Sequence, residues 1–322
     1  MISRRPLLQA LALSAIAVAR PVFPQQYPAR PIRFVVPASA GTTIDVTARF
    51  MAEAMGRALN VSIIVDNRAG AGAVIGTEYV AKSAPDGYTL LFTGIPLYLT
   101  KWLSEAPVSY DPVTDFAPIS LLCNSPLGIV VPANSPYKTL SDLVRAMRAK
   151  PDEITFSSGG NGSAAHLCMV LLNDLTQTVS KHIPYKGNTP AVTDVAGGQV
   201  DFTCQGSGGI VPLIRAGKLR PLAVTNRSRW DFLPEVPTAI EAGVPNFEMT
   251  GWIGVVARAG TPAPIVQRLS DEFVRIARTP EFKEFCNKQQ MFVDISDHKQ
   301  FAADVPRYDA TLKRLALLAK KG

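Results

Sequence analysis

Residues 32–49 read I-R-F-V-V-P-A-S-A-G-T-T-I-D-V-T-A-R, and the fold is organised around them. The apolar run Ile32–Val36 predicts a buried strand that ends at the following proline. A loop of small residues (38–41) leads into an apolar-periodic helix that Thr42 and Thr43 open. Such a turn leaves several N–H groups without acceptors beside the positive end of the helix dipole. Because no nucleophile with a base accompanies them, the stretch predicts binding of an anion such as a carboxylate.

The N-terminus has the pattern of a secretory signal. A pair of arginines precedes the apolar run Leu7–Val18, which is too short to span a bilayer. Ala17–Ala19 fits an A-x-A cleavage site, so we interpret residues 1–19 as a signal peptide, with Gln25 as the outer limit. The alternative, a buried core helix, does not explain the basic flank. We expect a periplasmic protein, and the paired arginines leave both the Sec and the Tat route open.

The composition is that of a globular chain of one or two domains. Of the 322 residues, 47% are hydrophobic and 18% are charged, which provides an ample core. Removing residues 1–19 takes away Arg4 and Arg5 and no acids, so the formal net charge falls from +7 to +5. The remaining basic residues are scattered, so we expect no nucleic-acid partner. A mild positive charge is compatible with an anionic small ligand.

The cysteines and histidines predict no metal site. The chain has four cysteines and no C-x-x-C motif: Cys123, Cys168, Cys204 and Cys286. Export permits disulfides, but buried free thiols fit the spacing equally well, and the pairing is left open. The three histidines are too widely separated to provide a metal-ligand spacing. We therefore expect neither a metal nor another cofactor.

Strands alternate with helices along the chain, which predicts an α/β fold with a parallel sheet covered on both faces. Strands are predicted at 62–65, 88–93, 154–158, 182–185, 200–204, 219–224 and 291–295. Helices are predicted to end near Lys82 and to cover 140–149, 163–175, 188–197, 264–278, 281–289 and the chain from 299. Two further apolar runs, 116–131 and 249–256, are interpreted as crossings between two lobes. The first of them is broken by Asn124–Pro126.

The turn at 157–166 repeats the design of the first one, with a strand, glycines and a helix that Ser163 opens. Ligands of α/β proteins usually bind in crevices at the carboxyl ends of parallel strands. If both helix starts face one cleft, a ligand with two acidic ends is held from both sides. The alternative is that both glycine-rich turns are only tight connections.

Several polar side chains near these turns have two interpretations each. Thr42-x-x-Asp45 fits a capping box better than a catalytic acid. His166 lies in the first turn of its helix, where it either faces the cleft or caps the loop. Lys186 and Arg68 either pair with ligand carboxylates or are solvated.

Three enzyme motifs are absent or incomplete. Gly70–Gly76 follows a strand and opens a helix, but it departs from the G-x-G-x-x-G of dinucleotide-binding loops. Gly206–Gly208 falls short of the G-x-S-x-G nucleophile elbow. No G-x-x-x-x-G-K-[ST] phosphate-binding loop occurs. We therefore predict no catalytic residues and do not expect an enzyme.

A series of short motifs, each weak alone, occurs in an order that is specific to one family. They are Y-P-x-R-P-I (27–32), N-R-x-G-A-G-x-x-x-G (67–76), P-D-G-Y-T-L (85–90), Y-D-P (110–112), D-F-A-P-I (115–119), G-x-G-S-x-x-H-L (160–167), P-Y-K-G (184–187), G-G-Q-V-D (197–201), V-P-T-x-x-E-x-G (236–243) and G-T-P-A-P (260–264). Over nearly all of its mature length the chain resembles the solute-binding proteins of tripartite tricarboxylate transporters, the Bug family.

The resemblance implies a periplasmic-binding-protein fold of type II, with two α/β lobes, two crossover strands and a cleft that closes on the ligand. Lobe 1 would comprise 26–125 plus 250–322, and lobe 2 would comprise 126–249. The ligand would be a small carboxylate, gripped largely by backbone amides and waters. The resemblance places ligand contacts at Ala38, Ser39, Gly41, Thr42, Thr43, Asp45, Thr93, Gly94, Ile95, Ser158, Gly160, Asn161, Ser163, His166, Gln205 and Gly206.

The sequence departs from the family pattern at two places near the expected cleft. The first loop usually reads P-F-x-P-G-G-[ST]-x-D, whereas here Ala38 replaces the aromatic residue and one glycine is missing. Gln205-Gly206 stands where the family often has Asp-Asn. The smaller Ala38 widens the pocket, and the lost acid removes a repulsive or orienting group. We therefore expect a ligand that differs from the commonest dicarboxylates and is bulkier or aromatic.

Together these patterns predict a monomeric two-lobed binder that closes on a small carboxylate and delivers it to a membrane permease. The alternatives are a ligand-sensing partner of a signalling receptor and an α/β enzyme. Turnover distinguishes the last of these, because a binding protein returns its ligand unchanged.

Overall fold

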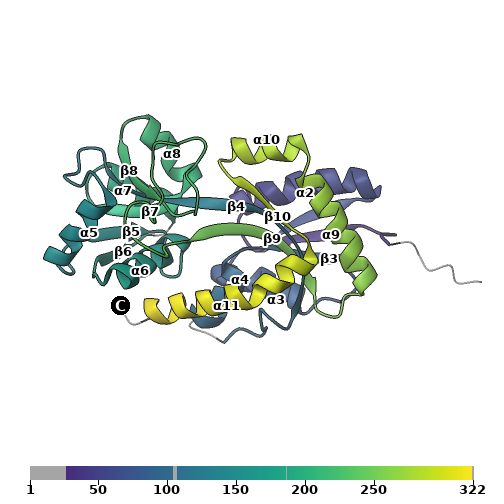
Figure 1. Ribbon diagram of the computed structural model, residues 1–322. Coiled ribbons are helices and arrows are strands. Elements are labelled where there is room, and N and C mark those ends of the chain that lie inside the picture. The colour runs from purple at the N-terminus through teal and green to yellow at the C-terminus, as the bar shows by residue number, and fades with distance from the viewer. Residues whose placement is uncertain (1–26, 104–106, 186, 321–322) are drawn as a thin grey trace, which may run out of the picture.

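Two groups of strands and helices lie side by side and are joined by two long strands (Figure 1). This computed structural model describes residues 27–103, 107–185 and 187–320. The strands form one ten-stranded mixed sheet with the order β2-β1-β3-β9-β4-β7-β5-β6, and β8 and β10 also pair with β4. The α/β architecture predicted from the alternating pattern is therefore confirmed, but the sheet is mixed where a parallel one was predicted, because the pairings that involve β4 and β9 are antiparallel.

The first group is built around β1, whose residues are nearly all buried. Its strands are β1 (Ile32–Val36), β2 (Ile63–Asn67), β3 (Thr89–Thr93) and β10 (Phe292–Ser296). Its helices are α2 (Thr43–Leu59), α3 (Val74–Ala81), α4 (Pro96–Leu103), α9 (Ala263–Ala277) and α10 (Pro280–Lys288), with a 3-10 turn η1 (Ala71–Ala73). Strands β2, β1 and β3 are parallel. Helix α2 packs on them because Ala48, Met51, Ala52 and Met55 recur at helical spacing on one buried face.

The second group repeats this arrangement. Its strands are β5 (Thr155–Ser158), β6 (Lys181–Pro184), β7 (Phe202–Gly206) and β8 (Leu219–Val224). Its helices are α5 (Leu140–Ala149), α6 (Ala164–Thr176), α7 (Asn188–Ala196) and α8 (Ser207–Arg215). Strands β6, β5 and β7 are parallel. Helix α5 begins with a complete capping box between Thr139 and Asp142, which fixes its start.

Strands β4 (Phe116–Pro132) and β9 (Thr250–Arg258) connect the two groups. Strand β4 pairs with β9 up to Pro126 and then, from Leu127 onward, with β7. The break at Asn124–Pro126 in the apolar pattern thus lies where β4 passes from one group to the other. The predicted lobe limits, 125/126 and 249/250, fall within β4 and directly before β9, and we propose that the lobes divide there.

The C-terminal helix α11 (His298–Ala319) lies along both groups (Figure 1). Arg314 of α11 forms an ion pair with Asp174 of α6. In the described ranges, no helix has the combination of length and hydropathy that crossing a bilayer requires. The predicted signal peptide, residues 1–19, lies outside the described residues.

Two short helices were not predicted from the sequence. Helix α4 begins with a proline, and α8 contains Gly208, Gly209 and Pro212. Glycine and proline lower intrinsic helix propensity, so packing against the sheet decides the conformation of such segments. Both helices border the cavities described below, and their omission affected the prediction of the site.

The structure resolves the open question of cysteine pairing. Cys168 in α6 and Cys204 in β7 form a disulfide, which ties the helix to the strand. Cys123 and Cys286 are buried free thiols. The neighbouring Cys286 thiol, together with burial, raises the pKa of the Cys123 thiol.

We predict that replacing both bridged cysteines (Cys168→Ala with Cys204→Ala) lowers the melting temperature by several degrees. The bridge spans 36 residues, and closing a loop of that length typically stabilises a protein by about 2–4 kcal/mol. Thermal unfolding measures the shift, and added reductant should then have no further effect on the double variant. Alkylation of the denatured, unreduced wild type should modify two thiols, and modification of four would contradict the pairing.

Candidate functional site

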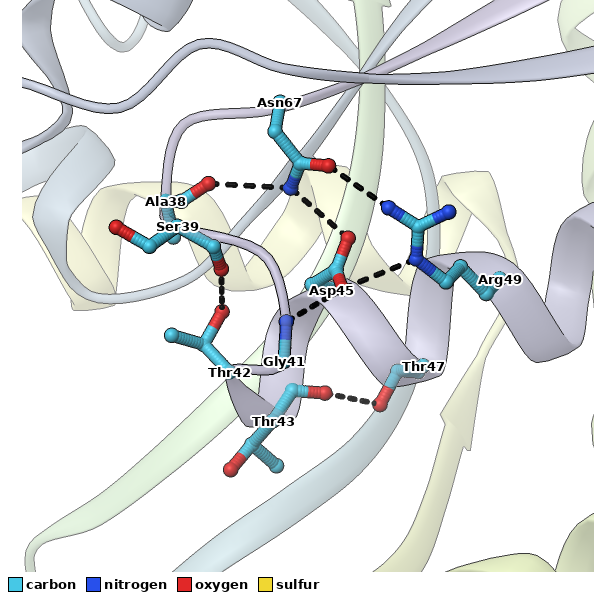
Figure 2. A network of polar contacts seen from close by, with 9 residues as sticks. All are labelled: Ala38, Ser39, Gly41, Thr42, Thr43, Asp45, Thr47, Arg49 and Asn67. Carbon is cyan, nitrogen blue, oxygen red and sulfur yellow. Dashed lines mark hydrogen bonds and ion pairs between the residues drawn. The ribbon is translucent and has the colours of Figure 1, made fainter.

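A buried carboxylate holds the loop between β1 and α2 (Figure 2). Asp45 is 1% exposed and accepts hydrogen bonds from the Gly41 N–H (2.8 Å), Arg49 Nε (3.0 Å) and Asn67 Nδ2 (2.8 Å). Asn67 Nδ2 also donates to the carbonyl of Ala38 at 3.1 Å. The acid that the resemblance placed at the ligand is therefore fully engaged in shaping the loop.

The capping box predicted for Thr42 and Asp45 is wrong. The Thr42 side chain makes no cap hydrogen bond and instead donates to the carbonyl of Ser39 at 2.8 Å. Asp45 accepts from Gly41, one residue before the N-cap, because Gly41 adopts a positive φ of 82° that turns the chain there. Consequently no side chain caps the first N–H groups of α2.

His166 caps the loop at 159–163 and lines neither of the two cavities described below. Its Nδ1 accepts from the Gly162 N–H at 3.0 Å, and its ring stacks on His182 with the centroids 4.2 Å apart. Burial and the neighbouring His182 lower the pKa of His166 to about 4, so the ring is neutral at pH 7 and can accept that bond. Ser163, the N-cap of α6, accepts from the His166 N–H. Of the two roles that the sequence left open for His166, facing the cleft or capping the loop, these contacts support capping the loop.

A cavity of about 600 Å³ lies where four helices begin. The helix starts contribute Thr43 of α2, Ala164 and Ala165 of α6, Asn188 and Thr189 of α7, and Ser207, Gly208 and Gly209 of α8, and Val192, Thr193 and Leu213 line it from further along α7 and α8. The strands contribute Ser125, Leu127, Gln205, Gly206 and Gly251. Among the described lining residues none carries a charge. The N–H groups and the positive dipole ends of the helices therefore dominate the electrostatics of this cavity.

Three of these four helix starts have no side-chain cap. Helices α2, α7 and α8 lack one, whereas Ser163 satisfies one N–H of α6. Helices α5, α10 and α11, which begin elsewhere, are capped by Thr139, Thr279 and Asp297. Helices α3 and α9 also lack side-chain caps, so the distinguishing feature is the convergence of uncapped starts on one cavity. Such a convergence suits an anion.

A second cavity, of about 780 Å³, borders the same two loops. Ala38, Ser39 and 161–163 line it from the loops, and Leu99 and Leu103 line it from α4. The remaining lining residues are Pro37, Ala69, Gly70, Ala71, Gly72, Ala73, Pro96 and Thr100. None of these described residues is charged, and most are apolar. This cavity suits an uncharged, apolar part of a ligand.

The structure distributes the predicted contact residues over three environments. The first cavity is lined by Thr43, Gln205 and Gly206, and the second by Ala38, Ser39, Asn161 and Ser163. Neither cavity is lined by Gly41, Thr42, Asp45, Thr93, Gly94, Ile95, Ser158, Gly160 or His166. Several of these support the fold instead; a Cβ on Gly94 would lie 2.5 Å from the carbonyl oxygen of Trp252 in β9.

The sequence placed Gly206, the N-cap of α8, among the contacts, but it did not predict the start of α7 or the first residues of α8 as part of the site. Both follow a strand through glycine, as α2 follows β1, so the same pattern was present at Gly187 and Gly206. Arg68, considered as a partner for a ligand carboxylate, pairs with Asp66 at 2.8 Å and stacks over Tyr79. Lys186 lies outside the described residues. Within the described part of the chain, no cluster of three metal-ligating side chains occurs.

The sequence and the fold resemble those of known binding proteins. Over residues 47–317 the chain matches the family described as "Tripartite tricarboxylate transporter family receptor". Protein BugT of Bordetella pertussis is 38% identical over 259 residues, which are 80% of this chain and 79% of BugT. The solved structure of R. palustris Rpa4515 with adipate has a TM-score of 0.79 and 31% identity, covering 91% of this chain and 98% of that one. MatC from Rhodopseudomonas palustris with bound malate has a TM-score of 0.75 and 28% identity, covering 90% and 100%.

The sheet threaded by two long strands and the uncapped helix starts at a shared cavity define a two-lobed solute-binding protein of the periplasmic type. The chain belongs to the receptor family of the tripartite tricarboxylate transporters. The resemblance found in the sequence motifs is therefore confirmed.

We predict that Asp45→Asn lowers the free energy of unfolding by about 1–3 kcal/mol, because hydrogen bonds to a charged group are lost. Burial raises the pKa of Asp45, but the hydrogen bonds from Arg49, Gly41 and Asn67 outweigh it, so the pKa lies below its ordinary value. The stabilisation is thus fully present above the ordinary Asp pKa and is lost as the pH falls through the depressed value. Urea unfolding at neutral and acidic pH measures the free energy of unfolding. This free energy should fall less between the two pH values in the variant than in the wild type.

Asp142→Asn is the matched control, because it weakens the capping box of α5 away from both cavities. Both variants should be less stable than the wild type, but only Asp45→Asn should also weaken ligand binding. Equal ligand affinity in Asp45→Asn and wild type would show that the loop does not depend on this carboxylate.

Proposed function

We propose that this receptor holds the carboxylate of its ligand in the 600 Å³ cavity at the starts of α2, α6, α7 and α8. The observation that carries the proposal is the convergence of these helix starts, three of them uncapped, on a cavity whose described lining has no charge. N–H groups at a helix start bind anions without a basic side chain. The adipate and malate bound by two similar receptors are small dicarboxylates, which supports the same class of ligand here.

The cavity draws on both groups of the fold, which supports binding by closure. Thr43 and Gln289 come from the first group, and the starts of α6, α7 and α8 come from the second. The Ser207 hydroxyl of α8 also donates to the Gln290 carbonyl at 2.6 Å, a direct contact between the groups. A ligand that contacts both sides selects the closed state, because these contacts are available only there.

We further propose that the ligand is bound and released unchanged by a monomer, which residues 1–19 direct to the periplasm and which docks with membrane permease subunits. The pair most similar to a catalytic dyad, Ser158 Oγ and His182 Nε2 at 2.7 Å, is an unsuitable nucleophile and base because Ser158 is fully buried. Native mass spectrometry of protein purified without refolding tests for a co-purified small acid. Recovery of a chemically altered ligand after incubation would favour an enzyme.

We call the cavity of about 600 Å³ at the four helix starts the anion cavity. We predict that Ala164→Asp lowers the affinity for dicarboxylates at least about tenfold, because it places a fixed negative charge in this cavity. An acid in the first turn interacts favourably with the helix dipole, so the thermal stability of the unliganded variant should not fall. Calorimetry with adipate and malate measures the affinities. Ala263→Asp is the control. Ala263 is the exposed first residue of α9, a helix that also lacks a side-chain cap but begins away from the cavity. The proposal fails if both variants bind as the wild type does.

The second cavity supports a ligand that is larger than a four-carbon acid. The loop residues Ala38, Ser39 and 161–163 line this cavity, while Thr43 and Ala164, a few residues further along each segment, line the anion cavity. We propose that a bulky or aromatic substituent of the ligand extends past the two loops into this apolar space.

We predict that Ala38→Phe fills part of this space and lowers the affinity for an aromatic dicarboxylate such as terephthalate at least about tenfold. The affinity for succinate, which fits within the anion cavity, should change much less. Calorimetry with both acids on wild type and variant measures the difference. Equal affinity of the wild type for succinate and terephthalate would contradict the proposed extension.

A further inference from the structure

Gln205 is a buried polar side chain that faces the anion cavity. It is 2% exposed, lies near the end of β7 and lines the cavity. Successive side chains of a strand point to opposite faces of the sheet. The preceding Cys204 is bonded to Cys168 of α6, so Gln205 points to the other face, together with Thr203. On that face the starts of α7 and α8 complete the cavity wall.

The amide of Gln205 has unused hydrogen-bonding capacity. An amide offers two donors and an acceptor with two lone pairs. Among the described residues, its side chain has one polar contact, from Nε2 to Thr203 Oγ1 at 3.5 Å, which is at the limit of a hydrogen bond. Thr203 Oγ1 itself donates to the Ser157 carbonyl at 2.7 Å. Because a buried polar group without partners is costly, the Gln205 amide is available to a polar group of the ligand.

The same cavity offers no partner for a positive charge. No acid is found among its described lining residues. The two acids nearest along the chain are engaged elsewhere: Asp45 by Gly41, Arg49 and Asn67, and Asp194 by the Tyr185 hydroxyl at 2.5 Å. An ammonium group in the cavity would face positive helix ends and only neutral side chains, of which the amide of Gln205 is buried while those of Asn188 and Gln289 are exposed. Its desolvation would therefore not be compensated.

We propose that Gln205 is the specificity-determining residue that restricts the ligand to carboxylic acids without an amino group. Its amide donates to a ligand oxygen, and, being neutral, it neither repels a carboxylate nor compensates an ammonium. This inference rests on the proposed function, since it assumes that the ligand occupies the cavity at the four helix starts.

Two substitutions separate the charge of this side chain from its size. Gln205→Glu is nearly isosteric and adds one negative charge, which repels a carboxylate and attracts an ammonium. Gln205→Leu has similar volume and removes all polar atoms, so it should weaken binding without favouring an amino group. A change of preference in Gln205→Glu alone therefore reports on charge.

The experiment uses matched pairs of acids that differ by an amino group: succinate and aspartate, glutarate and glutamate, adipate and 2-aminoadipate, phenylpropionate and phenylalanine. A thermal-shift screen of the wild type at pH 8 selects the acid that binds best, and calorimetry then compares it with its amino partner on wild type, Gln205→Glu and Gln205→Leu. We expect the wild type to prefer the plain acid at least about tenfold. In Gln205→Glu the ratio of the two affinities should fall at least about tenfold, so that the preference is lost or reversed. Gln205→Leu should still prefer the plain acid.

The outcomes separate the two proposals. If acids bind but the wild type accepts the amino partner equally well, or if Gln205→Glu leaves the ratio unchanged, the role of Gln205 is wrong and the carboxylate-binding function stands. If no acid of any pair binds the wild type, the proposed function fails, and this inference fails with it. Unliganded melting temperatures of the variants establish that all three proteins are folded.

Discussion

N–H groups at a helix start that no side chain caps must find an acceptor outside the helix, in water or in a ligand. This constraint governs the centre of the molecule, because α2, α7 and α8 begin without side-chain caps at a single cavity. A basic side chain would bind an anion equally well, but it brings conformational freedom and strong hydration. Backbone donors are fixed by the fold, so less ordering is needed when the ligand binds.

The charged and titratable groups near the site serve the loops and leave the cavity itself uncharged. Asp45 orients the first loop through Gly41 and Asn67, and the neutral ring of His166 accepts a hydrogen bond from Gly162 in the second. Both groups are buried, and each holds the loop directly before a helix start. Their substitution would therefore alter where the N–H groups point, although neither side chain lines either of the two cavities at the helix starts.

The sequence predicted the local elements well because strand and helix periodicities are local properties. The strand Ile32–Val36 and the start of α6 at Ser163 agree with the structure. The sequence could not reveal the strand order β4-β7-β5-β6, which brings the starts of α8 and α7 to the cavity, because strand order depends on long-range packing. For the same reason the pairing of Cys168 with Cys204 and the direction of the His166 ring remained open. The conformation at Gly41 redirected the Asp45 hydrogen bond in a way that the T-x-x-D spacing does not show.

In the function that we propose, the position of the cavity links ligand binding to closure of the two groups. Ser125 of β4 and Gly251 of β9 line the cavity at the crossing of the two groups, and a Cβ on Gly251 would lie 3.1 Å from the carbonyl oxygen of Ser125. The start of α2 belongs to one group, and the starts of α6, α7 and α8 belong to the other. Bringing these like-signed dipole ends together without an anion is unfavourable, since each end carries partial positive charge. An anion between them reverses the sign of that interaction, so the charge that the receptor recognises is also the charge that makes closure favourable.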